Sequence, residues 1–210
     1  MARILLVRHG ETALNSSQRF WGHTNVPLSS EGIQQAERLQ LRLSTENINT
    51  VYTSNLSRAV NTAQTIISDH ETGITVCPEL REINFGEIEG LTFDEVNNSY
   101  PEVTRLWLAK SMELSYPGGE SLKVFYQRVG SFLNRLEKHT ENETILVVAH
   151  AGVLRTLICH LLNLRMKHWW LTQLQLASLS IIETYQEGAV LALLNDVCHL
   201  KESDNRQKYE

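Results

Sequence analysis

The chain alternates short apolar runs with longer segments whose apolar residues recur every three or four positions. The apolar runs are rich in β-branched residues and end at polar or turn residues, which predicts buried strands at 4–7, 50–54, 74–77 and 144–148. The segments between them have the spacing of amphipathic helices. This alternation predicts an α/β fold of three layers (α/β/α), with a mostly parallel sheet of about six strands covered by helices on both faces.

Two regions depart from the alternation. Segments 176–184 and 189–194 are joined around Gly188 and predict a closing hairpin, which gives the sheet an antiparallel edge strand. The stretch 79–119 is interrupted by glycines and prolines and has only short apolar pieces between them. We interpret it as a small helical excursion over the active site, either a lid or a substrate wall.

Composition restricts the class of protein. With 210 residues, 42% of them apolar and 20% charged, the chain is typical of a globular protein with one domain, which we place at 1–200 and which a polar tail follows at 201–210. A net charge of −5 without a basic, aromatic-rich stretch argues against a nucleic-acid partner. No apolar stretch is long enough for a membrane helix, and the N-terminus lacks the pattern of a signal peptide. We therefore expect a cytoplasmic protein with no membrane partner, either a monomer or a homodimer.

The three cysteines, Cys77, Cys159 and Cys198, lie far apart and form no CxxC pair. We interpret them as small buried hydrophobic residues, with metal ligands and a disulfide framework as the alternatives. Nothing else in the sequence has the ligand spacing of a metal site.

Charged side chains stand where several of the predicted strands end. Arg8 and His9 end the first strand, and His150 ends the most hydrophobic one. Arg58 and Glu82 follow two further strands. Ligands of open α/β sheets bind outside the carboxyl ends of the strands. If these strands are parallel neighbours, the five side chains converge in one crevice.

Such a set can bind and transfer a phosphoryl group. An arginine guanidinium group can donate two parallel hydrogen bonds to phosphate oxygens. Two arginines with two histidines can balance the charge of a phosphomonoester. A neutral imidazole of His9 can attack phosphorus and form a phosphohistidine, which water then hydrolyses. Glu82 is the carboxylate of the set, so it is the candidate general acid and later the general base. Each residue alone has a structural alternative, such as a hydrogen-bonded core histidine or a carboxylate that pairs with Arg81.

Residues around this set are candidates for substrate binding. Trp21 and its neighbour Gly22 lie in the polar loop after the first strand, and Trp21 could stack on a substrate ring or simply pack. Ala151 and Gly152 begin the helix that follows His150, and the amides at a helix N-terminus can bind an anion.

Four motifs together resemble the histidine phosphatase (phosphoglycerate mutase-like) superfamily, and they occur in order over nearly the whole chain. They are Arg8-His9-Gly10-Glu11-Thr12 with Asn15, the block from Thr53 to Ala63 around Arg58, Leu80-x-Glu82, and His150-Ala151-Gly152. The resemblance implies that His9 is phosphorylated and that Arg8, Arg58 and His150 contact the phosphoryl group. It implies that Asn15 lines the same pocket and that Glu82 donates the proton. It also implies that the site holds neither a metal nor an organic cofactor.

Further motifs resemble one branch of this superfamily, the α-ribazole phosphatases of cobalamin biosynthesis and related broad-specificity phosphatases. They are Phe85-Gly86 with Glu89-Gly90, Pro117 to Ser121, and His150 to Arg155. This resemblance implies a hydrolase of small phosphomonoesters, with α-ribazole 5′-phosphate as the expected substrate. A broad-specificity or sugar-phosphate phosphatase is the alternative, and a cofactor-dependent phosphoglycerate mutase is less favoured because arginines that would hold the phosphoglycerate carboxylate are not evident. A phosphate-binding regulatory protein is the non-enzymatic alternative.

Overall fold

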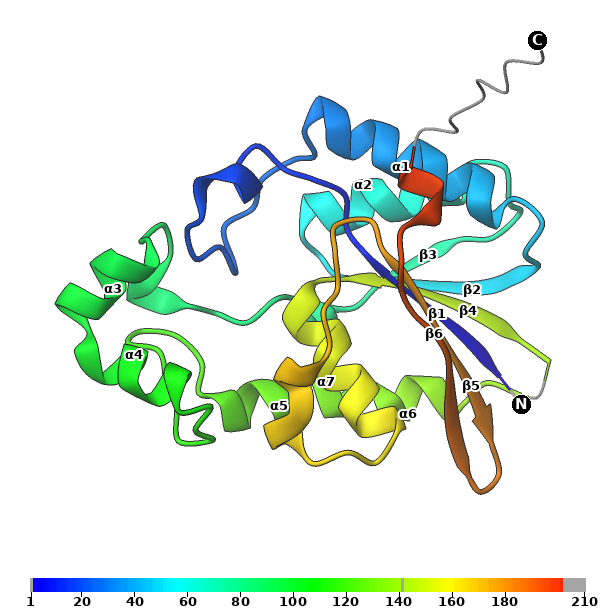
Figure 1. Ribbon diagram of the computed structural model, residues 1–210. Helices are drawn as coiled ribbons and strands as arrows, with labels where there is room; N and C mark the ends of the chain where they lie inside the picture. The colour runs from blue at the N-terminus through cyan, green and yellow to red at the C-terminus, as the bar shows by residue number, and fades with distance from the viewer. Residues whose placement is uncertain (1, 141, 202–210) are drawn as a thin grey trace, which may run out of the picture.

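The protein is built around one sheet, seen in a computed structural model that describes residues 2–140 and 142–201. Its strands are β1 (Arg3–Arg8), β2 (Ile48–Thr53), β3 (Ile74–Val76), β4 (Thr144–Ala149), β5 (Leu179–Tyr185) and β6 (Gly188–Asp196). They form a six-stranded sheet in the order β3-β2-β4-β1-β5-β6 (Figure 1). The first four strands of this order are parallel, β5 is antiparallel to β1, and β6 is antiparallel to β5. The predicted, mostly parallel sheet with an antiparallel edge is confirmed.

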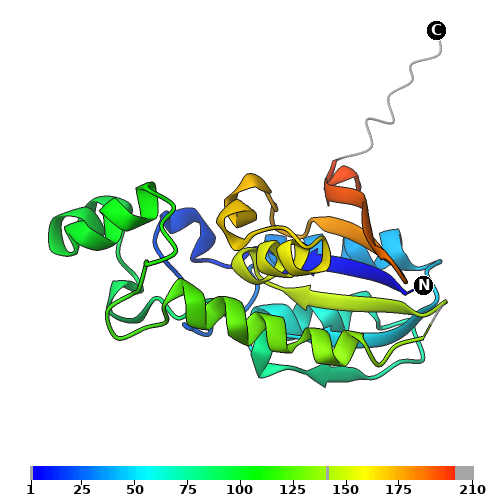
Figure 2. The ribbon, with the colours of Figure 1, turned by 90° about the horizontal axis from the view of Figure 1, so that it is seen from below.

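Helices cover both faces of this sheet. They are α1 (Ser30–Leu43), α2 (Ser57–Ile66), α3 (Phe93–Ser99), α4 (Pro101–Leu108), α5 (Leu122–Ser131), α6 (Leu133–Leu136) and α7 (Ala151–Leu161). Short 3-10 helices are η1 (Asn15–Ser17), η2 (Pro78–Leu80), η3 (Gly86–Ile88), η4 (Met166–Leu171) and η5 (Cys198–Leu200). Figure 1 shows α1 and α2 above the sheet and α5 to α7 below it, and Figure 2, seen from below, shows α5 to α7 in front of the sheet, which confirms the three layers.

The central strands are buried on both faces because their side chains alternate between the two helical layers. Leu5 of β1 packs in one cluster with Leu39 of α1 and with residues of α2. Ile4 and Leu6 belong to a second cluster that contains Phe125 of α5 and residues of α7. The continuous apolar runs that predicted buried strands therefore fill two cores at once.

Polar residues fix where several helices begin. Ser29 accepts a hydrogen bond from the Gly32 amide and caps the start of α1. Ser121 does the same for α5 through the Val124 amide, so this serine acts as a helix cap. Each cap satisfies an amide that the first turn of a helix leaves without a backbone partner.

The predicted excursion at 79–119 carries α3 and α4 and lies beside the loop that follows β1 (Figure 1). Two backbone hydrogen bonds join them: the Phe20 amide donates to the Leu91 carbonyl over 2.9 Å, and the Gly90 amide donates to the Phe20 carbonyl over 2.8 Å. The excursion thus borders the carboxyl end of the parallel strands. A single domain at 1–200 stays a prediction, and the predicted tail after Lys201 lies outside the described residues.

One prediction about burial is wrong. Cys77 and Cys159 are buried as expected, but Cys198 is exposed, because it follows the end of β6 in a surface turn. The described part of the chain contains no helix that is both long and apolar enough to cross a membrane.

Burial predicts the effect of two matched substitutions on α1. Leu39 is 0% exposed and Leu41 is 74% exposed. We expect Leu39→Ala to lower the free energy of unfolding by about 2–5 kcal/mol, because it leaves a cavity under the sheet. Leu41→Ala should change it by less than about 0.5 kcal/mol. Urea denaturation followed by circular dichroism measures both, and equal effects would contradict the packing of α1.

Candidate active site

The pairing of β1 with β4 brings the two predicted strand-end histidines together. Arg8 lies opposite Ala149 in the parallel register, and the His9 amide donates to the Ala149 carbonyl over 3.0 Å. The imidazole rings of His9 and His150 consequently lie 5.0 Å apart between centroids.

A small cavity of about 60 Å³ opens beside these histidines. It is lined by Arg8, His9, Thr12, Leu14, Asn15, Trp21, Val26, Arg58 and Glu82. Six of these residues are predicted site residues. Thr12 was named only as part of the first motif, and Leu14 and Val26 were not named. His150, Gly22, Ala151 and Gly152 do not line the cavity.

His9 is held in one tautomer. It is 4% exposed, and its Nδ1–H donates to the Gly10 carbonyl over 2.7 Å. Nε2 is then the nitrogen with the lone pair, and it has no hydrogen-bond partner among the described residues. Burial, with the charges of Arg58 and Arg8, lowers the pKa of His9 well below its ordinary value. The imidazole is therefore neutral at physiological pH, as a nucleophile requires.

His150 does not line the cavity but contacts Arg58, which does. Its Nδ1 accepts a hydrogen bond from Arg58 Nε over 3.3 Å, and its Nε2–H donates to Ser54 Oγ over 2.8 Å. Burial, followed by the influence of His9 and Arg58, lowers the pKa of His150 well below its ordinary value. Both ring nitrogens are engaged, so in this conformation His150 orients Arg58.

The two arginines are anchored by backbone carbonyls. Arg58 donates from its two terminal nitrogens to the Thr24 and Gly22 carbonyls, each over 2.8 Å. Arg8 donates to the Leu174 carbonyl over 2.6 Å, and its buried Nε has no partner among the described residues. Desolvation lowers the pKa of Arg8 to about 10, so the guanidinium still carries its charge at neutral pH. Two desolvated cations beside one carboxylate leave the cavity ready for an anion.

Glu82 is a buried carboxylate held by two backbone amides. Its Oε2 accepts from the Gly152 amide over 3.1 Å, and its Oε1 accepts from the Ile83 amide over 3.0 Å. A Cβ at Gly152 would lie 2.5 Å from Glu82 Oε1, so any side chain there would displace the Glu82 carboxylate. The Gly152 amide that we expected to bind substrate therefore binds Glu82.

The loop that carries Trp21 is shaped by the same contacts. Trp21 Nε1–H donates to Ser17 Oγ over 2.9 Å, which fixes the indole against the cavity. A Cβ at Gly22 would lie 2.0 Å from the Ile83 carbonyl, so this position admits only glycine. Asn15 Oδ1 accepts from the Thr12 amide and from its hydroxyl, over 2.7 and 2.8 Å. Gly22 therefore acts through its backbone, whereas Trp21 and Asn15 present side chains to the cavity.

No motif in the sequence points to Arg128, which holds the segment that carries Glu82. Its guanidinium donates to the carbonyls of Glu79, Arg81 and Glu82 over 2.7–3.2 Å. It also pairs with Glu120, whose Oε2 accepts from the Asn84 amide over 2.9 Å. Glu120 and Arg128 thus position this segment together.

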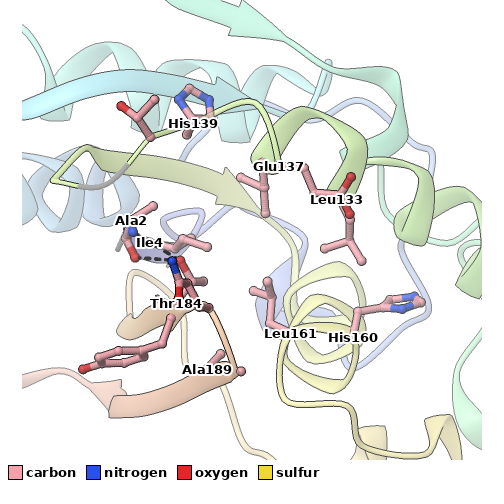
Figure 3. Close-up of a pocket in the computed structure, with 14 residues that line it drawn as sticks. Ala2, Ile4, Leu133, Glu137, His139, His160, Leu161, Thr184 and Ala189 are labelled. Atoms are coloured by element: carbon pink, nitrogen blue, oxygen red, sulfur yellow. Dashed lines mark hydrogen bonds between the residues drawn. The ribbon is translucent and has the colours of Figure 1, made fainter.

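A larger cavity of about 480 Å³ lies at the amino end of β1, away from these residues. Its lining includes Ala2, Ile4, Leu133, His139, His160, Leu161, Thr184 and Ala189 (Figure 3). Thr184 Oγ1 accepts from the Ala2 amide, and His139 bonds to Glu143 and to the Tyr52 hydroxyl. None of the described residues that line it is an arginine, so this cavity lacks the charge that a phosphate needs.

A neutral histidine beside two desolvated arginines and a carboxylate is suited to phosphoryl transfer. The chain matches the histidine phosphatase superfamily (branch 1) over residues 4–197, and it belongs to this superfamily. The predicted family, fold and phosphatase class of enzyme are confirmed.

Phosphatases named for two different substrates, phosphoserine and alpha-ribazole phosphate, have nearly equal sequence identity to this chain. Phosphoserine phosphatase 1 of Hydrogenobacter thermophilus is 34% identical over 202 residues, which are 96% of each chain. The adenosylcobalamin/alpha-ribazole phosphatase of Escherichia coli is 33% identical over 193 residues, which are 92% of this chain and 95% of the relative. Among solved structures, the alpha-ribazole phosphatase from Shigella flexneri has a TM-score of 0.86 at 32% identity, with 92% and 96% of the two chains covered. A phosphoserine phosphatase mutant from Entamoeba histolytica, in complex with phosphoserine, has a TM-score of 0.84 at 30% identity, with 96% and 100% covered.

The contact between Gly152 and Glu82 predicts the effect of one methyl group. We expect Gly152→Ala to displace the carboxylate and to lower kcat on p-nitrophenyl phosphate by at least about tenfold. The matched control is Gly73→Ala, because a Cβ there meets nothing within 4 Å. Steady-state kinetics measure both, with circular dichroism to confirm folding. An unchanged kcat in folded Gly152→Ala would contradict the importance of this contact.

Proposed function

We propose that the protein hydrolyses small phosphomonoesters through a phosphohistidine on His9. The observation that carries the proposal is the neutral His9 imidazole, whose Nδ1–H is fixed on the Gly10 carbonyl and whose Nε2 is free in a cavity lined by two arginines. The cavity volume of about 60 Å³ suits a phosphoryl group, while the remainder of a substrate extends past the loop of Trp21.

In the first step, the lone pair of His9 Nε2 forms a bond to phosphorus, and the phosphorus–oxygen bond of the ester breaks. Glu82 gives its proton to the leaving oxygen. Arg8 and Arg58 balance the charge that spreads over the phosphoryl oxygens. His150 keeps Arg58 oriented through its Nδ1, and contacts the phosphoryl group if that hydrogen bond opens.

In the second step, water takes the place of the leaving group. The Glu82 carboxylate accepts a proton from this water as its oxygen attacks phosphorus. The bond between phosphorus and His9 Nε2 breaks, and inorganic phosphate leaves. Glu82 ends the cycle protonated and His9 ends it neutral, so the enzyme returns to its starting state without a metal or an organic cofactor.

We assign α-ribazole 5′-phosphate as the substrate, in cytoplasmic cobalamin biosynthesis. The adenosylcobalamin/alpha-ribazole phosphatase of Escherichia coli supports this assignment by its 33% identity. Trp21 supports it chemically, because an indole fixed at the cavity can stack on the flat benzimidazole ring that this ester carries. Phosphoserine is the second candidate, favoured by the 34% identity to phosphoserine phosphatase 1.

A panel of esters tests the substrate assignment. We expect kcat/KM for α-ribazole 5′-phosphate to exceed that for phosphoserine, 3-phosphoglycerate and ribose 5-phosphate by at least about tenfold, which corresponds to about 1.4 kcal/mol of extra transition-state binding. Trp21→Leu should lower kcat/KM for α-ribazole 5′-phosphate by about tenfold and leave ribose 5-phosphate, which lacks the ring, nearly unchanged.

Other patterns of kcat/KM across the panel of esters would overturn parts of the proposal. Equal values across the panel would indicate a broad-specificity phosphatase, and a preference for phosphoserine would move the assignment to the second candidate. Phosphate binding without turnover of any ester would indicate a regulatory protein.

A further inference from the structure

We infer that Asp196, Cys198 and His199 form a binding site for one divalent transition-metal ion of the zinc type. The three residues lie where β6 ends and the η5 turn packs on α1, drawn in red beside α1 in Figure 1. A carboxylate oxygen, a thiol sulfur and a ring nitrogen lie within 4.8 Å of one another. The site is separate from the residues of the phosphoryl cavity.

The tautomer of His199 is that of a metal ligand. Its Nε2–H donates to the Ala177 carbonyl over 3.0 Å, so Nδ1 carries the lone pair. This Nδ1 is buried and has no hydrogen-bond partner among the described residues. Metal-binding histidines commonly donate their second ring N–H to a carbonyl in this way. A buried polar nitrogen without a partner is costly, and a bound metal would satisfy it.

Local hydrogen bonding explains Asp196 and Cys198 but not His199. Asp196 Oδ1 accepts from the Cys198 amide over 3.0 Å, and Cys198 Sγ lies 3.2 Å from Asp196 Oδ2. These contacts are those of an ordinary turn. The buried Nδ1 of His199, which has no hydrogen-bond partner among the described residues, is the observation that distinguishes a metal site from such a turn.

The donor set selects the class of metal. Thiolate, imidazole and carboxylate are all ligands of zinc, and a soft thiolate disfavours magnesium and calcium. Three protein donors leave a fourth position for water. Arg42 Nε lies 3.9 Å from Asp196 Oδ2, where it orients the carboxylate, although its positive charge weakens the affinity for a cation.

Binding is a proton-coupled step without a redox change. The S–H bond of Cys198 breaks, the sulfur bonds to the metal, and the proton leaves to solvent. The bound ion would join the end of β6 to the η5 turn and so hold the turn against α1. Because none of the three proposed ligands lines the phosphoryl cavity, phosphatase activity should be the same with and without the ion.

Cobalt(II) is the probe, because its bond to a thiolate gives a charge-transfer band in the near ultraviolet. We expect the full chain, stripped with a chelator, to bind one equivalent with this band. Cys198→Ser should abolish the band, and His199→Gln should weaken binding by at least about tenfold. His168→Gln is the matched control, because His168 is also partly buried but lies outside the site, and it should bind like the wild type.

Zinc gives a second readout, because it should raise the Tm of the wild type and not that of Cys198→Ser. The unchanged phosphatase activity of each variant confirms that it is folded. The inference is overturned if the wild type shows no saturable binding, or if Cys198→Ser keeps the band, since the remaining cysteines are buried elsewhere.

Discussion

The active site depends on the parallel pairing of β1 with β4. This pairing runs in register from Arg3 opposite Thr144 to Arg8 opposite Ala149, and the next residue of each strand is a histidine. Because side chains alternate across a strand, a slip of one residue would turn His9 and His150 to different faces of the sheet. The apolar side chains of both strands, buried in two helical layers, exclude such a slip. The packing that stabilises the fold therefore also sets the distance between the two imidazoles.

Burial determines which side chains of the site are charged. Both histidines are kept neutral by desolvation and by neighbouring guanidinium groups, while Arg8 and Arg58 keep their charge. Carbonyl groups anchor the arginines, and backbone amides anchor Glu82. A buried excess of positive charge opposes folding, and a bound phosphate would compensate it. The free enzyme is thus arranged for an anion before the anion arrives.

The sequence predicted the parts of the site that depend on local pattern. Polar residues at the ends of the predicted strands were expected to meet, because parallel strands end at one edge of a sheet. Arg8, His9 and Glu82 do line the cavity. What the sequence did not predict are contacts between segments far apart in the chain. The sequence pattern predicts only that Arg128 is a polar residue on an amphipathic helix. Its hydrogen bonds to the carbonyls around Glu82 form only in the folded chain. The sequence predicts that Gly152 lies at the start of a helix, but it does not predict the close approach of this residue to Glu82.

The proposed mechanism requires that His9 becomes covalently phosphorylated. Rapid-quench mixing of the enzyme with a substrate labelled on its phosphoryl group tests it most directly. We expect a labelled protein within the first turnover, with an acid-labile and alkali-stable bond that maps to the peptide containing His9. His9→Ala should give neither label nor turnover. Full turnover without a labelled intermediate at any quench time, or normal turnover by His9→Ala, would contradict a phosphohistidine mechanism on His9.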